Sequence, residues 1–274
     1  MICIRRYFLA ILVLSIFFLF DLTWGNLGAE QQNENNMVKV PAGPFMMGSS
    51  GEDMEWAVRT FFSGSIEWYQ DETPDQAVYL EEFFIDRTEV TVASFAEFTR
   101  ETGQPVSKYF DNDKFNQPDQ PVVGVSWKEA IDYCSWRGKR LPTETEWEKA
   151  ARGIDGRRYP WGNEPNPLKG NVRGMKDKFR YTAPVGSFSE GQSPYGAQDM
   201  AGNVFEWTQD WYEPYPGNDK VSDMFGKKFK VIRGGSWKAD MDLARSALRG
   251  KAFPDQRSNY VGFRCAKDSS SKEN

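Results

Sequence analysis

Residues 231–237 read VIRGGSW, and the chain reaches GFRC at residues 262–265, shortly before its end. A third stretch, GNVFEW, precedes them at residues 202–207. These three motifs decide the fold, because they belong to an ordered set that extends over most of the chain. There is no cysteine between Ser236 and Asp255, which restricts the chemistry that this part of the chain can perform.

The N-terminus has the pattern of an export signal. Arg5 and Arg6 precede an apolar run over residues 7–20, and small residues follow at Gly25 and residues 28–29, as in a cleavable leader. The apolar run is shorter than the roughly 20 residues of a membrane span. An uncleaved anchor and a twin-arginine signal remain as alternatives. We expect a periplasmic or extracellular protein, attached to a membrane only through an uncleaved leader.

The rest of the chain predicts a single domain. We expect an export signal over residues 1–29, a polar linker over 30–36, one domain over 37–267 and a disordered tail over 268–274. The charge is mildly acidic, with 34 Lys and Arg against 39 Asp and Glu. Since no basic stripe occurs, we do not expect nucleic acid as a partner.

Histidine is absent from the sequence. It is the usual general base near neutral pH and the commonest ligand for zinc, copper and non-haem iron. Its absence excludes Ser-His-Asp and Cys-His catalysis and the two-histidine iron site. Any reaction would need carboxylates, lysine, tyrosine, a thiol or a bound hard cation.

Local patterns predict short, well-delimited elements. Residues 37–48 read as a strand, a Pro/Gly turn and a second strand, and residues 83–86 as another strand. Apolar spacing predicts a helix over residues 91–100 with Gly103 at its C-terminus. Capping boxes at 126–129 and 143–146 predict two more helices, which end near Gly138 and at Gly153.

From residue 159 onward Gly, Pro, Asn, Asp and aromatic residues dominate, with turns at 159–163 and 194–196. A loop-rich half of a domain usually needs a disulfide or bound cations to hold it.

An ordered series of motifs covers nearly the whole exported part of the chain. It consists of VPAG at 40–43, MG at 47–48, DETP at 71–74, FIDRTEVT at 84–91, PVVGVSW at 121–127, RLPTETEWE at 140–148, YPWGN at 159–163 and TAPV at 182–185. With the three C-terminal motifs, the series resembles the sulfatase-modifying-factor domain, the fold of the formylglycine-generating enzyme. The resemblance implies a compact α+β domain related to the C-type lectin fold, with little regular structure.

The resemblance also implies a disulfide between Cys134 and Cys265, since both fall where the family has one. The alternative is two unlinked buried thiols. Closing a loop of about 130 residues would stabilise the fold by roughly 5 kcal/mol on the chain-entropy model. If the bridge forms, no free thiol remains in the mature protein.

Two calcium sites are carried over from the family in the same way. Each combines two oxygen-bearing side chains with two main-chain carbonyls, as a hard cation requires. The matching residues are Asn171, Val172, Asp177 and Phe179 for the first site, and Asp199, Gly202, Val204 and Glu206 for the second. The alternative is that these Asp and Asn side chains bond their own turns. The family usually has Asn where this chain has Asp199.

The expected active site is where the chain departs from the family. The formylglycine-generating enzyme uses two cysteines just after the Gly-Gly-Ser motif to bind copper and oxidise a substrate cysteine. The nearest residues here are Ala239 and Met241. Without a thiolate pair we do not expect copper, and the sulfoxide synthases that share the domain need histidines. The groove is expected near Ser236, Ala239, Met241, Arg245 and Arg249.

Two further readings stay open for this region. Asp240 and Asp242, with Arg245 and Arg249, are candidates for acid–base work, but a solvated loop to which the arginines bond is the preferred interpretation. The aromatic residues are mostly core. Four aromatic residues that we expect to be exposed are better suited to stacking on a sugar: Trp56, Trp68, Tyr212 and Tyr215.

We therefore expect an exported, non-catalytic protein that acts as a protein-binding, glycan-binding or structural subunit. The alternative is a protein-modifying enzyme of the formylglycine-generating oxidase family with altered chemistry.

Overall fold

The three C-terminal motifs meet in a four-stranded sheet. β5 (Phe205–Trp211) lies beside β6 (Lys230–Arg233) in antiparallel register and beside β8 (Val261–Gly262) in parallel register. β7 (Gly250–Ala252) completes the order β7-β6-β5-β8. Segments far apart in sequence are thus hydrogen-bonded neighbours in one sheet, which explains why the three motifs belong to one set.

The computed structural model of the protein describes residues 36–63, 65–174 and 176–269. The expected export signal and residues 270–274 of the expected tail lie outside these ranges. From Val38 onward the described residues form one compact unit. Within the described ranges, no helix has the length and apolar character needed to cross a membrane.

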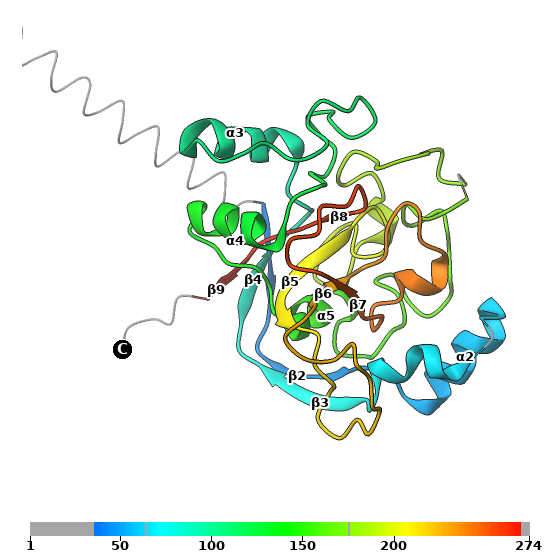
Figure 1. Ribbon diagram of the computed structural model, residues 1–274. Helices are drawn as coiled ribbons and strands as arrows, with labels where there is room; N and C mark the ends of the chain where they lie inside the picture. Colours follow the sequence, from blue (N-terminus) through cyan, green and yellow to red (C-terminus); the bar gives the residue numbers. More distant parts are fainter. Residues whose placement is uncertain (1–35, 64, 175, 270–274) are drawn as a thin grey trace, which may run out of the picture. The chain divides into compact units, whose positions relative to one another are not determined.

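Two smaller sheets lie beside the first (Figure 1). One has the order β1-β4-β9, formed by Met37–Val40, Phe83–Asp86 and Ala266–Asp268. In the other, β2 (Gly43–Met47) pairs with β3 (Gln76–Leu80). The final strand includes Asp268, one residue beyond the boundary expected at 267.

The predicted helices form with the predicted caps. α3 (Val92–Thr102) begins after Thr91 and ends at Gly103. α4 (Trp127–Trp136) and α5 (Glu144–Arg152) both have complete capping boxes, in which a hydroxyl and a glutamate satisfy each other's backbone amides. The sequence predictions for these three helices are confirmed.

One helix was not predicted. α2 (Gly51–Phe61) begins at Ser50 with a capping box completed by Asp53 instead of the usual Glu or Gln. It buries only Ala57 completely, so its apolar spacing is a weak signal. Three 3-10 helices complete the regular structure of the described residues: η1 (Ile66–Glu72), η2 (Ser189–Gly191) and η3 (Met241–Ala244).

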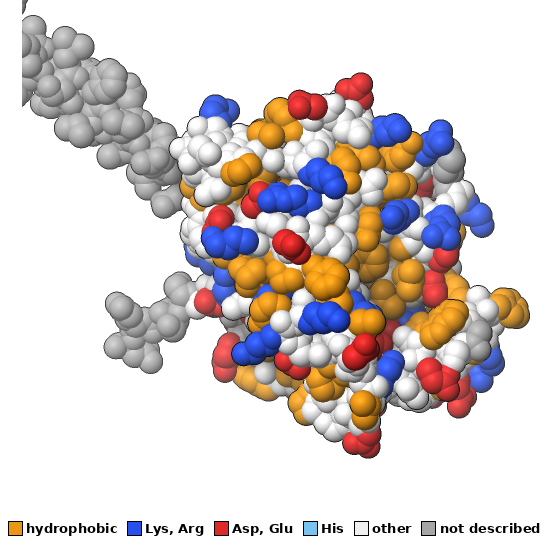
Figure 2. All heavy atoms as spheres, viewed as in Figure 1, with side chains coloured by type: hydrophobic (Ala, Val, Ile, Leu, Met, Phe, Trp, Pro, Cys, Tyr) orange, Lys and Arg blue, Asp and Glu red, His pale blue; other side chains and the backbone are white. Residues whose placement is uncertain are grey.

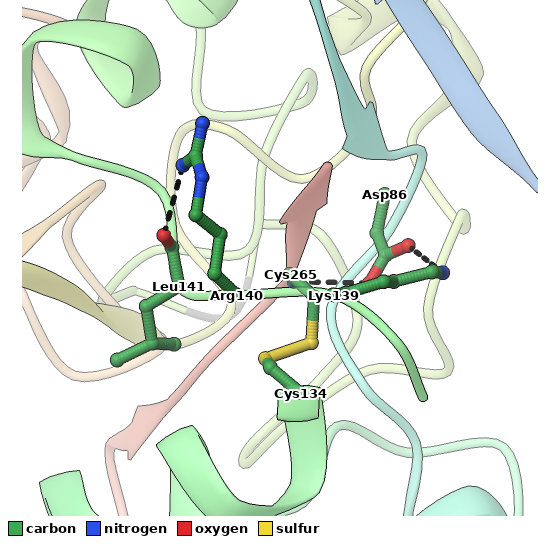
Figure 3. The surroundings of a disulfide bond; sticks show 6 residues. All are labelled: Asp86, Cys134, Lys139, Arg140, Leu141 and Cys265. Atoms are coloured by element: carbon green, nitrogen blue, oxygen red, sulfur yellow. Dashed lines mark hydrogen bonds and ion pairs between the residues drawn. A yellow bond between two sulfur atoms is a disulfide. The ribbon is translucent and has the colours of Figure 1, made fainter. Parts of the chain in front are cut away.

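The expected disulfide is present and ties α4 to the C-terminal strand region (Figure 3). Cys134 lies in α4, and Cys265 directly precedes β9 instead of lying on the last strand, as expected. Both cysteines are fully buried and belong to the apolar cluster that contains Trp207 and Phe263. Asp86 accepts from the Cys265 backbone N–H at 2.9 Å, so the bridge is anchored to β4 as well.

Candidate functional site

The segment that follows the Gly-Gly-Ser motif folds into a tight apolar turn. The Ala239 N–H donates to the Ser236 carbonyl at 2.9 Å, and η3 begins two residues later. Ala239 is buried, and the half-buried Met241 packs against Val172 and its apolar neighbours. Apolar side chains therefore occupy the two positions nearest to the family's thiols.

Gly235 permits this close packing. Its φ is +76°, and a Cβ at this position would lie 2.8 Å from the Leu243 carbonyl oxygen and 3.0 Å from the Ala244 Cα. Any other residue would push η3 away from the sheet. Ser236 beside it is fully buried, and its hydroxyl has no hydrogen-bond partner among the described residues.

The arginines expected in the groove are buried in ion pairs. Arg245 makes two parallel bonds to the Glu72 carboxylate, Nη1 to Oε2 at 2.8 Å and Nη2 to Oε1 at 2.7 Å. Arg249 makes a similar pair with Glu144, from Nε at 2.7 Å and Nη2 at 2.9 Å. The expectation of a solvated loop is wrong for these side chains, because their carboxylate partners come from η1 and α5.

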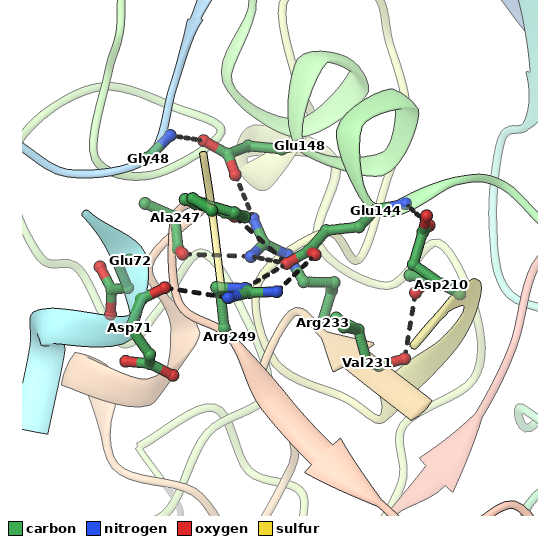
Figure 4. Close-up of polar contacts among 12 residues, drawn as sticks. Gly48, Asp71, Glu72, Glu144, Glu148, Asp210, Val231, Arg233, Ala247 and Arg249 are labelled. Atoms are coloured by element: carbon green, nitrogen blue, oxygen red, sulfur yellow. Dashed lines mark hydrogen bonds and ion pairs between the residues drawn. The ribbon is translucent and has the colours of Figure 1, made fainter. Parts of the chain in front are cut away.

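Glu144 is the centre of a larger buried network (Figure 4). Besides Arg249, it accepts from Arg233 Nη1 at 3.1 Å and from the Tyr215 hydroxyl at 3.2 Å. Arg233 also pairs with Glu148 at 2.6 Å, and Glu148 pairs with Arg152 at 2.8 Å. Three guanidinium groups thus share two carboxylates inside the protein.

The two aspartates of the same segment have separate partners. Asp240 is exposed and pairs with Arg173 at 3.1 Å. Asp242 is half-buried and accepts from the Tyr69 hydroxyl at 3.4 Å. Burial raises the pKa of Asp242 above its ordinary value. The structure gives them no shared position for acid–base catalysis.

The first expected calcium loop is closed by Asp177. Its carboxylate accepts from the Val172 N–H at 3.2 Å and from the Phe179 N–H at 2.9 Å. Asn171 donates to the Tyr181 carbonyl at 2.8 Å, while its own Oδ1 is buried without a donor among the described residues. This orphaned oxygen fits a cation ligand. Asp177 fits in part, because each carboxylate oxygen keeps a second lone pair.

The second expected set is only partly suited to a cation. Asp199 accepts from the Gly186 N–H at 2.6 Å through one oxygen, and its other oxygen is buried without a donor in the described part of the chain. Glu206 is already occupied, since Arg264 donates to both of its oxygens at 2.6 and 2.8 Å and Trp147 Nε1 donates at 2.8 Å.

Glu89 is a buried acid that the sequence analysis missed. Only 2% of it is exposed, and neither carboxylate oxygen has a donor among the described residues. Burial, and then the neighbouring Asp199, raises the pKa of Glu89 well above its ordinary value. The available signal in the sequence was an acidic residue within the motif at 84–91. Once the fold buries such an acid, it needs a partner.

The two expected cation loops contact each other. The Asn203 N–H donates to the Asn171 carbonyl at 2.8 Å. Gly202 has φ +100°, and a Cβ there would lie 2.3 Å from the same carbonyl oxygen. Across residues 36–63, 65–174 and 176–269, no three Cys, Asp or Glu side chains converge at metal-binding spacing. Each cation would therefore depend on backbone carbonyls as well.

Of the aromatic residues expected to be available for stacking, Trp68 alone is well exposed, at 65%. Trp56 is half-buried, and Arg158 lies over its ring at 4.3 Å. Tyr212 and Tyr215 are buried, at 3% and 6% exposure. The expectation that these two tyrosines are exposed is wrong, because the Arg249 guanidinium packs against both rings.

Comparison with known proteins agrees with this geometry. The family model of the sulfatase-modifying factor enzyme 1-like domain matches residues 25–269. The formylglycine-generating enzyme of Streptomyces coelicolor is 33% identical, over 88% of this chain and 91% of that protein. The inactive C-alpha-formylglycine-generating enzyme 2 of Mus musculus is also 33% identical, over 84% of this chain and 85% of that protein.

Among solved structures, PvdO from Pseudomonas aeruginosa is similar to this chain. It superimposes with a TM-score of 0.68 at 28% identity, over 85% of this chain and 94% of PvdO. The sequence matches and the structural match thus each cover most of the chain. On both grounds, the chain belongs to the sulfatase-modifying factor enzyme 1-like family, with the α+β fold of the formylglycine-generating enzyme.

Proposed function

We propose that this protein is a non-catalytic, exported member of its family that binds a protein or glycan partner. The observation that carries the proposal is the apolar turn after Ser236, where Ala239 and Met241 stand at the positions nearest to the family's thiols. Copper(I) is selected by soft sulfur ligands, and Cys134 and Cys265 are joined to each other. The chain therefore offers no thiolate pair in this turn to oxidise a substrate cysteine.

A turnover assay with the full chain tests the loss of chemistry. A sulfatase-type peptide is incubated with copper and oxygen, and the mass of its cysteine is followed. The enzyme from Streptomyces coelicolor serves as the positive control. We expect the peptide mass to stay unchanged. Loss of the thiol mass signature would instead support an oxidase of altered chemistry.

A second experiment tests binding directly. Affinity capture from the native envelope, followed by quantitative mass spectrometry, should return a partner in fixed stoichiometry. Capture of no stoichiometric partner, together with measurable turnover, would overturn the proposal. N-terminal sequencing of the exported protein tests the leader: a start near residue 30 indicates cleavage, and an intact N-terminus in the membrane fraction indicates an anchor.

We also propose that calcium is bound by the two interlocked loops. Asn171 and Asp177 would hold one ion, and Asp199 with Glu89 the other, each with main-chain carbonyls. The orphaned oxygens of Asn171, Asp199 and Glu89 support this assignment. Calcium would supply positive charge that offsets buried carboxylates and links loops of little regular structure. Glu206 is a weaker ligand, because Arg264 already neutralises it.

Chelation tests the calcium proposal. Removing calcium should lower the melting temperature, and adding it back should restore the original value. Glu89→Gln should lower the affinity for terbium, measured by luminescence titration. Glu55→Gln, at an exposed position in α2, should leave that affinity unchanged. Equal melting temperatures with and without chelator, and no saturable terbium signal, would contradict it.

A further inference from the structure

An open pocket lies on a face that the resemblance leaves unassigned. Its volume is about 330 Å³, within the size range of small-molecule sites. It lies between η1 and the segment that follows β5. It is lined by Glu67, Trp68, Asp71, Tyr212, Lys220, Ser222, Met224, Phe225 and Lys251. Figure 2 shows that exposed apolar side chains and basic side chains lie close together on the face in view.

One part of the lining is aromatic and firmly held. Tyr212 stacks on Phe225 with ring centroids 5.2 Å apart, and its hydroxyl donates to the Asp71 carboxylate. The backbone carbonyl of Asp71 accepts from Arg249 at 3.0 Å, so the buried ion network supports this side of the pocket. Trp68, largely exposed, presents a broad apolar ring to a ligand.

Two ammonium groups complete the lining. Lys220 Nζ donates to the Glu67 carbonyl at 2.9 Å, and Lys251 Nζ lies 4.9 Å from the centre of the Tyr212 ring. Neither forms an ion pair with any residue in the described part of the chain. Both can therefore donate to an anion, and Lys220 also interacts electrostatically with the Asp71 carboxyl. The Asp71 oxygen that Tyr212 does not use can accept from a hydroxyl donor.

We propose that this pocket binds an acidic sugar unit, a hexuronate within an anionic glycan. The apolar face of the sugar ring would stack on Trp68, and the sugar carboxylate would accept charge-assisted bonds from the two lysines. The sugar hydroxyls would hydrogen-bond to Asp71 and Ser222. A neutral sugar leaves the lysines without partners, and an acidic peptide side chain has no hydroxyl for Asp71. The proposal rests on the proposed binding function and names its ligand.

Calorimetry with the full chain tests it, using an oligogalacturonate and an uncharged oligogalactoside of the same length. We expect saturable binding of the acidic oligomer alone. Binding should weaken about tenfold in Lys220→Gln/Lys251→Gln, because each charge-assisted bond contributes strongly. It should also weaken in Trp68→Ala. Lys128→Gln and Phe62→Ala, at exposed positions outside the pocket lining, are the matched controls.

Three outcomes overturn the proposal: no saturable binding, equal binding of the neutral oligomer, or equal affinity of the pocket variants and the controls. Preference for an Asp-rich peptide that depends on the same lysines would also overturn it. These results are separable from the proposed function. A stoichiometric partner without turnover would keep the protein a binding module even if the sugar assignment fails.

Discussion

Replacing Glu144 by glutamine should destabilise the fold far more than its small change in shape suggests. The carboxylate accepts four hydrogen bonds, from two atoms of Arg249, from Arg233 and from Tyr215. An amide removes the charge and turns an N–H₂ group toward the guanidinium groups. Arg152 and Arg233 would keep Glu148, whereas Arg249 would lose the only carboxylate with which it forms an ion pair among the described residues.

The expected loss is about 3–5 kcal/mol, the range observed when one partner of a buried ion pair is removed. The matched control is Glu55→Gln, which breaks an exposed pair with Arg59 whose side chains are 63% and 68% exposed. Such a pair contributes at most about 1 kcal/mol. Equilibrium unfolding in urea, followed by tryptophan fluorescence at constant ionic strength, measures both variants.

The effect should depend on pH in a defined direction. Burial alone would raise the pKa of Glu144, but Arg249 and Arg233 outweigh burial and hold that pKa below its ordinary value. A carboxyl with a lowered pKa stabilises the fold above its unfolded pKa, about 4.3, and loses that contribution as the pH falls through the folded pKa. The gap between wild type and Glu144→Gln should therefore narrow below about pH 4.

Two results would refute this reasoning. One is a loss at neutral pH no larger than that of Glu55→Gln, which would mean that the network is solvated. The other is a gap that stays constant in acid, which would mean that shape and not charge causes the loss.

Three further predictions concern the scaffold and the pocket. Unfolding free energy should fall by about 5 kcal/mol in Cys134→Ala/Cys265→Ala, because the bridge closes a loop of 131 residues. Gly235→Ala should cost about 2 kcal/mol in the same assay, since its φ is positive. Burial and Glu72 raise the pKa of Asp71, so Asp71→Asn should stabilise the fold at neutral pH. Denaturation at acidic pH, where Asp71 is protonated, should remove that gain.

Local signals account for the elements that the sequence predicted well. The capping boxes at Ser126 and Thr143 lie within four residues of sequence, so their hydrogen bonds can be anticipated without knowing the fold. α2 escaped prediction, because Asp53 replaces the usual Glu or Gln of its box and because its surface is mostly solvated. Its apolar spacing could not supply the missing signal.

The functional residues also divide into those that the sequence reveals and those that only the fold reveals. The absence of cysteine between Ser236 and Asp255 and of histidine anywhere is a property of the sequence, and no fold can change it. The roles of Arg245 and Arg249 could not be read from it, since their partners Glu72 and Glu144 lie 173 and 105 residues away. The same holds for Glu89, because only the fold buries it beside Asp199 without a donor among the described residues.

The sequence by itself determined the family and the loss of the thiol pair, and through the family resemblance it indicated the disulfide partners, because these depend on residue identity and motif order. The tertiary structure decided which charges are buried, which oxygens lack donors and where aromatic and basic side chains enclose a pocket. Those properties arise from contacts between segments far apart in the chain. Their energies depend on burial, because a charge removed from water must find a partner in the fold.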